Sequence, residues 1–124
     1  VHTHDVGLAL ANALDTDAIW GRILHIGGGP RCQLLYREIA AKALEAMGVG
    51  MLPDAAFSET PFCTDWLDTR ESEALLHYQR HTYDDFCRDV ARLAGWRRGM
   101  VRTFRPLVRA WLLARSPYYR RAHP

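Results

Sequence analysis

Long apolar runs are missing from this sequence. No stretch approaches the ~20 consecutive apolar residues that a membrane-spanning helix needs, and no segment has the basic, apolar and small-residue order of a signal peptide. The sequence therefore predicts a soluble, cytoplasmic protein. Its 124 residues fit one ordinary domain. The chain opens on Val1 without an initiator methionine, from which we expect a fragment of something longer.

Cysteine is scarce, and the three cysteines do not form a recognisable pattern. Cys32, Cys63 and Cys87 are odd in number, widely spaced and free of any CxxC motif. This usage predicts neither a disulfide framework nor a zinc knuckle, and it is typical of a reducing compartment. Nucleophilic catalysis is not indicated either, because no serine or cysteine sits in GxSxG or beside a plausible histidine and acid pair.

Nucleotide-binding motifs are also absent. Neither GxGxxG nor GxxxxGK followed by Ser or Thr occurs, although HIGGGP at 25–30 places three glycines after a predicted strand. We interpret these glycines as a strand-to-helix turn. We therefore expect this chain alone to bind no cofactor, neither NAD nor NADP.

Acidic residues are absent after Asp89. Up to that position the chain carries seven basic residues against fourteen acids, a net charge of 7 − 14 = −7, whereas the rest carries nine arginines and no acid. Such a split predicts a basic tail that docks on an acidic body, on a partner or on an anionic surface.

The predicted helix at 106–115 is the part of this tail best suited to a contact. Pro106 suits the first turn of a helix, and Ser116 with Pro117 ends the pattern. An apolar stripe flanked by arginines packs on protein or lies at an anionic membrane. We expect docking on protein first, a membrane surface second and nucleic acid last. The expected contact residues are Arg105, Leu107, Val108, Trp111 and Leu112.

Two histidines near the start suggest a metal site. His2 and His4 make HxH before an aspartate, a pattern that metal-dependent hydrolases use at a strand end. Further ligands would have to come from His25, His77 or His81, and no spacing argues for any of them. We therefore predict no metal and interpret these side chains as solvated or cap-adjacent histidines.

Helical periodicity dominates the chain, so we predict an α+β, mostly helical fold with a few short strands. Thr3 or Asp5 is expected to cap the first helix, and the pairs Asp68/Glu71 and Thr82/Asp85 are typical of capping boxes. Helices are expected at 5–14, 35–47, 69–78, 83–93 and 106–115, with stops at Gly48 and Gly95, and strands at 22–26 and 66–67.

Four strings in order resemble a known family. They are VHTHDVGLALANAL, then ILHIGGG, then a Tyr-Arg-Glu-Ile helix ending in Met-Gly, and then WLDTRESEALLHYQRHTYDDF. Together they resemble the C-terminal part of the extended short-chain dehydrogenase/reductases, the NAD-dependent epimerase/dehydratase family. The resemblance covers about residues 1–93. It implies a substrate-binding lobe of a Rossmann-type protein at 1–95, followed by a basic extension at 96–124.

The resemblance implies an oxidoreductase or isomerase that uses NAD or NADP in the full-length parent. The family's TGxxGxxG loop and Tyr-x-x-x-Lys pair are absent, since the only lysine, Lys42, has Glu38 four residues before it. We expect this chain alone to be inactive, because no base is present to move a proton with the hydride. Its expected partners are the missing N-terminal cofactor-binding domain and, through the apolar surface left uncovered, further copies of itself. The acids expected to receive the basic helix of a neighbour are Asp65, Asp68, Glu71 and Glu73.

The resemblance also bears on the substrate. Relatives that act on nucleotide sugars place an arginine in the loop before the Asp-Thr-like helix, but no basic residue occurs here between Lys42 and Arg70. We therefore expect a small neutral or apolar substrate, contacted by Phe57, Phe62 and Trp66; the alternative interpretation of these three residues is as core aromatics. The alternative function is a non-catalytic interaction module whose arginine-rich amphipathic helix binds a protein partner or an anionic membrane surface.

Overall fold

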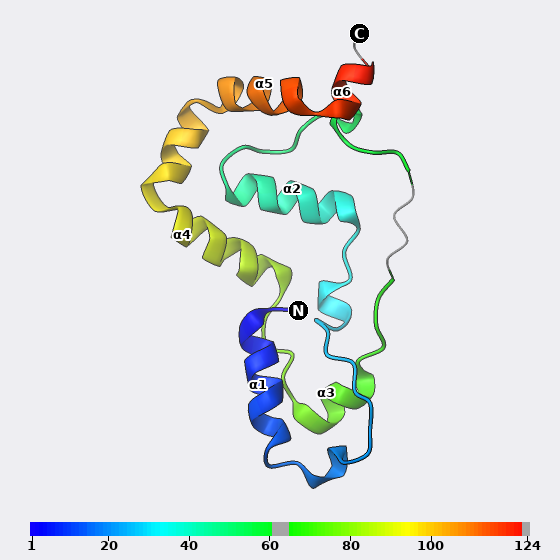
Figure 1. The fold of residues 1–124 in the computed structure, drawn as a ribbon. Coiled ribbons are helices and arrows are strands. Elements are labelled where there is room, and N and C mark those ends of the chain that lie inside the picture. The colour runs from blue at the N-terminus through cyan, green and yellow to red at the C-terminus, as the bar shows by residue number, and fades with distance from the viewer. Residues whose placement is uncertain (61–64, 123–124) are drawn as a thin grey trace. The chain divides into compact units, whose positions relative to one another are not determined.

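The structure, a computed structural model, describes residues 1–60 and 65–122 (Figure 1). The chain divides into two compact units, each made of two separate stretches. Unit 1 is Val1–Leu34 with Thr64–Phe86, and unit 2 is Leu35–Cys63 with Cys87–Pro124. Residues 96–124, expected from the sequence to form an extension, thus fall in the same unit as Leu35–Cys63. None of the helices in the described residues is long and apolar enough to cross a membrane.

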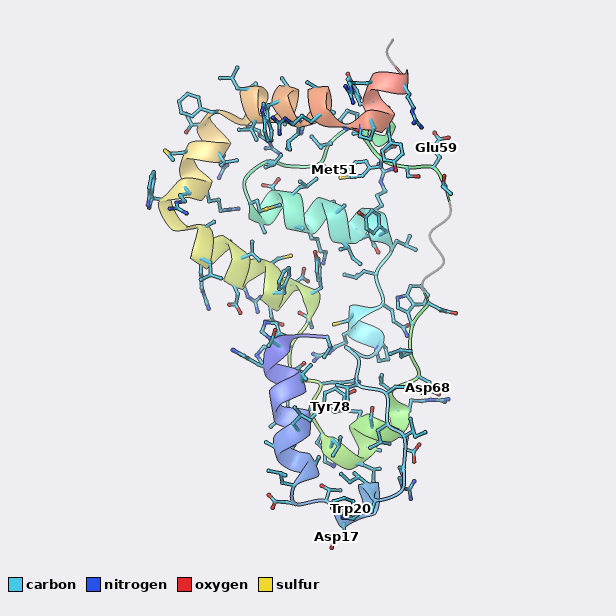
Figure 2. The ribbon with its side chains drawn as sticks, in the orientation of Figure 1. Asp17, Trp20, Met51, Glu59, Asp68 and Tyr78 are labelled. Atoms are coloured by element: carbon cyan, nitrogen blue, oxygen red, sulfur yellow. The ribbon has the colours of Figure 1, made fainter. Side chains whose placement is uncertain are left out.

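Unit 1 is built on two helices, α1 (Thr3–Ala13) and α3 (Arg70–Leu76), with 3₁₀ turns η1 (Asp17–Ile19) and η2 (Pro30–Cys32) between them in sequence. Figure 2 shows Tyr78 between α1 and α3. Its side chain is fully buried and forms the core with Ala9 and Leu76. Half-buried side chains pack around this core, namely Leu8, Ala13, Ile19, Leu24, Ile26 and Leu75.

The predicted strands are wrong, whereas the prediction of a mostly helical fold is confirmed. Residues 22–26 and 66–67 are irregular, and no strand occurs anywhere in 1–60 or 65–122. A strand needs a neighbouring strand to accept and donate its ladder hydrogen bonds. Around 22–29 side chains take that role instead: Ser72 Oγ donates to the His25 carbonyl at 2.6 Å, and the Gly27 N–H donates to the Tyr78 hydroxyl at 3.1 Å.

The observed helix caps agree only in part with those predicted from the sequence. The N-cap of α1 is His2, whose ring accepts the His4 N–H at 3.3 Å, so neither Thr3 nor Asp5 caps this helix as predicted. Thr82 and Asp85 do form the predicted capping box, because the Asp85 carboxylate accepts the Thr82 N–H at 2.7 Å.

The predicted box of Asp68 and Glu71 is wrong. Asp68 accepts from the N–H and guanidinium of Arg70, and Glu71 pairs with the guanidinium of Arg22. The helix therefore begins at Arg70, behind the N-cap Thr69. It ends at Leu76 because the next residue is left-handed, with φ 47°, which stops the helical ladder.

Unit 2 contains α2 (Tyr36–Ala46), the 3₁₀ turn η3 (Asp54–Ala56), α5 (Arg105–Arg115), α6 (Pro117–Ala122) and the larger part of α4 (Tyr83–Thr103). The predicted stop at Gly95 is confirmed as an interruption, since its φ of 50° and ψ of −130° are not helical. Helix resumes beyond it as far as Thr103. The predicted start and end of the last long helix, near Pro106 and at Ser116, are also confirmed.

Three arginines of the basic segment are bound to the end of α2 and the loop after it. Arg98 Nε donates to the Ala46 carbonyl at 2.9 Å, and Arg105 Nε donates to the Val49 carbonyl at 2.8 Å. The Arg109 guanidinium reaches the Met51 carbonyl at 2.6 Å. The last carbonyls of a helix have no partner within it and carry the negative end of its dipole. The basic segment thus docks on its own unit, chiefly through backbone carbonyls.

Candidate functional site

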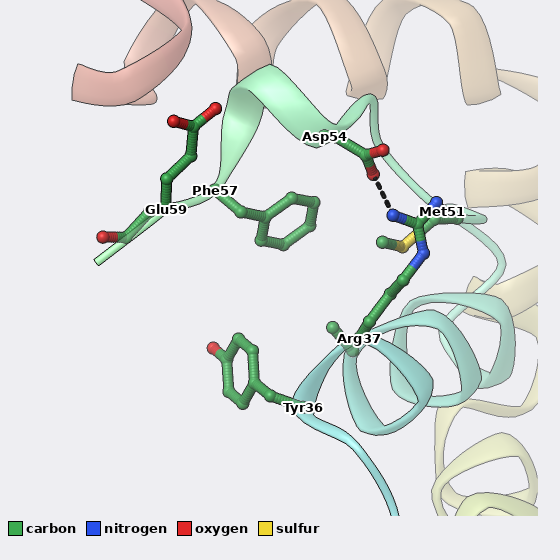
Figure 3. Close-up of a pocket in the computed structure, with 8 residues that line it drawn as sticks. Tyr36, Arg37, Met51, Asp54, Phe57 and Glu59 are labelled. Atoms are coloured by element: carbon green, nitrogen blue, oxygen red, sulfur yellow. Dashed lines mark ion pairs between the residues drawn. The ribbon is translucent and has the colours of Figure 1, made fainter. Parts of the chain in front are cut away.

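A pocket in unit 2 opens beside the first turn of α2 (Figure 3). Its volume is about 270 Å³. The aromatic rings of Tyr36 and Phe57 stand on either side of it, and the loop that follows α2 supplies its remaining wall. The full lining comprises Tyr36, Arg37, Ala40, Met51, Asp54, Phe57, Ser58 and Glu59.

An ion pair sets the charge of this pocket. Arg37 Nη1 lies 2.7 Å from Asp54 Oδ1, drawn as the dashed line in Figure 3. With Glu59 also in the lining, the described lining residues hold one cation and two acids. Arg37 was not predicted from the sequence, because the loop after Lys42 has no basic residue of its own, whereas folding brings Arg37 from α2 onto that loop. This balance disfavours an anionic ligand, since Arg37 is paired with Asp54.

Of the two predicted substrate residues that the structure describes, only Phe57 belongs to this pocket. Phe57 lines it, and Phe62 lies outside the described residues. Trp66 belongs to unit 1, where it borders a second hollow of about 280 Å³ and is 54% exposed. That hollow is lined by Pro30, Gln33, Trp66, Leu67, Asp68, Thr69 and Arg70.

The charged group of the second hollow is a bidentate pair. Arg70 Nε and Nη2 lie 3.1 and 2.7 Å from the two carboxylate oxygens of Asp68. This guanidinium, together with the backbone N–H of Arg70, lowers the pKa of Asp68 to about 2. The carboxylate in turn raises the pKa of Arg70. Both side chains are exposed, so solvent screens the pair and it adds little to the stability of the fold.

The Asp68 carboxyl group should titrate with a pKa of about 2, below its ordinary 3.8, in a carboxyl-detected NMR titration. Arg70→Gln should return it toward 3.8, because the hydrogen bonds to the ionised form are lost. Since the folded-state pKa is the lower one, the pair's contribution to stability is present above pH 3.8 and is lost as the pH falls toward 2. A wild-type pKa near 3.8 would contradict the pairing.

Three histidines meet in unit 1. His81 comes from the segment before α4, yet its ring stacks on His2 with centroids 4.6 Å apart and lies 5.6 Å from the ring of His4. Its Nδ1 is 2.6 Å from a carboxylate oxygen of Asp5, which is only 1% exposed. The structure therefore supplies the third histidine that no sequence spacing indicated. No local signal could have found it, because 76 residues separate Asp5 from His81.

The predicted contact helix presents a face different from the expected one. Arg105 and Arg109 turn toward the loop after α2, and Val108 and Leu112 are half-buried. Leu107 remains 69% exposed. The outer face of α5 is thus apolar with a single arginine, and it consists of Pro106, Leu107, Ala110, Trp111, Ala114 and Arg115.

The acids predicted to receive a neighbour's arginines already have partners in their own chain. Glu73 accepts the N–H groups of Tyr78 and Gln79 at 3.0 and 2.9 Å. Asp68 and Glu71 pair with Arg70 and Arg22 of the same chain. Asp65 accepts the backbone N–H of Trp66 at 2.7 Å. Charge pairing between copies therefore has little support in this part of unit 1.

Comparison with known proteins found no relative of this chain. No family model matches the chain, and no curated protein or solved structure is significantly similar to it. What the chain does is therefore inferred from its own residues and their contacts.

Proposed function

We propose that the chain is the substrate-binding lobe of a larger NAD(P)-dependent epimerase/dehydratase-like protein of the extended short-chain dehydrogenase/reductase type. One observation carries this proposal. Three of the strings on which the resemblance rests, at 1–14, 23–29 and 66–86, fold together into unit 1. Their contacts within one unit support the proposal.

Hydrogen bonds join the three strings in pairs. Gly27 of the second string is held by the third, because its N–H donates to the Tyr78 hydroxyl at 3.1 Å and its carbonyl accepts from Gln79 Nε2 at 3.2 Å. The first string meets the third where the Asp5 carboxylate accepts the His81 N–H at 3.0 Å. Each of these hydrogen bonds joins residues of two different strings, which supports the proposal that the strings belong to one lobe.

The segment at 22–29 also suits contact with a further domain. It has no regular secondary structure, and Ile23 on it is 90% exposed. A large apolar side chain left in solvent favours burial against another surface. A cofactor-binding domain would supply such a surface in the parent protein.

The glycine turn itself does not suit a dinucleotide. A Cβ atom on Gly29 would lie 2.0 Å from Gln79 Oε1, so the side chain of Gln79 already fills the space beside this glycine. A phosphate-binding loop leaves that approach open to the ligand. No residue of this chain is therefore assigned to the cofactor, and the hydride chemistry belongs to the cofactor-binding domain. The role left for this lobe is to bind the substrate, and the pocket between Tyr36 and Phe57 suits a small neutral molecule.

The chain as given should show no saturable binding of NAD or NADP and no dehydrogenase or epimerase turnover. The missing glycine fingerprint and the filled space beside Gly29 are the reasons. Isothermal titration calorimetry with each dinucleotide measures this. Micromolar binding of either one would contradict the expectation.

Reading the gene on the 5′ side of the Val1 codon tests the proposal itself. We expect the same reading frame to encode TGxxGxxG followed by Tyr-x-x-x-Lys, and the longer protein to bind NAD or NADP. A start codon next to the Val1 codon, with no such motifs in frame, would overturn the assignment while leaving the calorimetry result intact.

Self-association through α5 is the second candidate function. The apolar outer face of this helix favours it, because large side chains at 107 and 111 alternate with alanines at 110 and 114. Such alternation lets the large residues of one copy pack over the small residues of another, as a two-fold interface requires. An anionic membrane is less well matched, since Arg105 and Arg109 are bound to carbonyls of the same unit.

A further inference from the structure

We propose that His2, His4 and His81 form a zinc-binding site. Each offers one ring nitrogen, and these three atoms lie within 4.8 Å of one another. Two of the histidines come from the start of α1 and the third from the segment before α4, so the site exists only in the folded unit. This inference is independent of the substrate-lobe assignment, and it replaces our sequence-based prediction of no metal.

Asp5 holds the third histidine in place. Its carboxylate is buried and receives both the backbone N–H of His81 at 3.0 Å and the ring Nδ1 at 2.6 Å. With Nδ1 bound to a carboxylate, the ring would offer Nε2 to a metal. Carboxylate-histidine-metal chains of this kind fix the tautomer and the direction of a ligand and increase its basicity.

The other two ligands stand on the first turn of α1. His2 Nδ1 accepts the His4 N–H at 3.3 Å, so coordination by His2 would use Nε2. The His2 and His4 ring centroids are 5.0 Å apart and their planes are inclined by 70°. His2 is half-buried and His4 is exposed, which leaves their rings room to turn toward a shared ion.

Binding would tighten the cluster. Zinc bonds to imidazole nitrogen at ~2.0–2.1 Å in tetrahedral geometry, so ligand nitrogens approach to roughly 3.4 Å. The stacked rings of His2 and His81, inclined by only 20°, must therefore rotate apart. This rotation gives the site a spectroscopic signature that surface adsorption of zinc would not produce.

The donor set selects the class of metal. Three imidazoles favour zinc, copper, nickel or cobalt over magnesium and calcium, which prefer oxygen ligands. The carboxylate of Asp5 is engaged with His81, so it orients a ligand instead of binding the ion. Three protein ligands leave a fourth position for water or a small anion, the arrangement found in zinc sites that act on bound molecules.

Calorimetric titration of the untagged, chelator-treated chain with zinc chloride tests the site. We expect one Zn²⁺ per chain with a micromolar or lower Kd, and no heat with magnesium chloride. His4→Ala should weaken binding by ~100-fold or more, and Asp5→Asn by ~10–100-fold, the usual range for a residue that orients a ligand. His77→Ala and His25→Ala are matched controls, since both histidines are exposed and lie outside the cluster.

Imidazole NMR gives a second readout that does not depend on affinity. Zinc should shift the ring resonances of His2, His4 and His81 together and leave those of His25 and His77 in place. Circular dichroism establishes that each variant is folded, and His4→Ala keeps the test valid if Asp5→Asn unfolds, because the side chain of His4 is exposed. No zinc binding, or zinc binding that survives His4→Ala unchanged, would overturn the proposal.

Discussion

Tyr78→Ala should lower the free energy of unfolding of unit 1 by about 3–5 kcal/mol, the usual cost of removing a buried aromatic ring. Tyr78 is 0% exposed, and among the described residues its cluster holds only two further buried hydrophobic side chains, those of Ala9 and Leu76. A core this small has few neighbours that could close the cavity. Since small domains are stable by only about 5–15 kcal/mol, the loss would take away a large share of the total.

The hydroxyl group of Tyr78 adds a separable part of this effect. It accepts the Gly27 N–H at 3.1 Å and lies 3.1 Å from Ser72 Oγ, which is itself within donating distance of the His25 and Thr69 carbonyls. Tyr78→Phe keeps the ring but leaves the part-buried Gly27 N–H without this partner, at a cost of about 1 kcal/mol.

Urea unfolding followed by circular dichroism measures both variants. Tyr36→Ala is the matched control, because this tyrosine is 70% exposed and its loss should change stability by no more than about 0.5 kcal/mol. Equal unfolding midpoints for Tyr78→Ala and Tyr36→Ala would contradict the core described here.

Trp111→Ala should weaken self-association by roughly two orders of magnitude, equivalent to about 3 kcal/mol. Trp111 is 56% exposed on the outer face of α5, and the Arg115 guanidinium carbon lies 4.4 Å from the centre of its ring. Tryptophan and arginine side by side are the residues most often found to dominate a protein interface. Burying this ring against another copy removes its remaining exposed area from water.

Light scattering and sedimentation at micromolar concentration measure the association. Trp20→Ala is the matched control, since Trp20 is 78% exposed but belongs to unit 1. A monomeric wild-type chain would contradict self-association, and an unchanged oligomer in Trp111→Ala would contradict the assignment to α5. Binding of a monomeric wild type to phosphatidylserine vesicles would favour the membrane alternative.

Local signals in the sequence predicted the helices well. Thr82 with Asp85, Gly95 and Pro106 each act within a few residues, so their effects are visible without knowing the fold. The prediction of a capping box at Asp68 and Glu71 was wrong because a distant residue binds one of the two. Arg22, 49 residues away in the sequence, pairs with the Glu71 carboxylate. The prediction of a strand at 22–26 was wrong for a related reason. Alternating apolar residues indicate a segment with two faces, but a strand also needs a neighbouring strand to pair with.

The candidate sites depend almost entirely on such distant contacts. Arg37 reaches the pocket because the loop after α2 folds back over the first turn of that helix. His81 reaches His2 and His4 because Asp5 binds it across 76 residues. Helical and strand periods describe neighbours two to four residues apart, so neither site could be predicted from them. Phe57 lies in the pocket's own loop, so the sequence around it could point to this region, while its contact with a substrate stays a prediction.

The interleaving of the two units has a consequence for the chain during its synthesis. Residues 1–34 leave the ribosome before the rest of unit 1, and they cannot complete this unit until residues as far as Phe86 have followed. At ordinary elongation rates this wait lasts roughly 3–10 s. Throughout it the site that Tyr78 will fill stays open and Asp5 has no His81 to bind. The nascent chain therefore presents an unfinished apolar surface to chaperones, and slower translation between residues 34 and 86 would prolong that exposure.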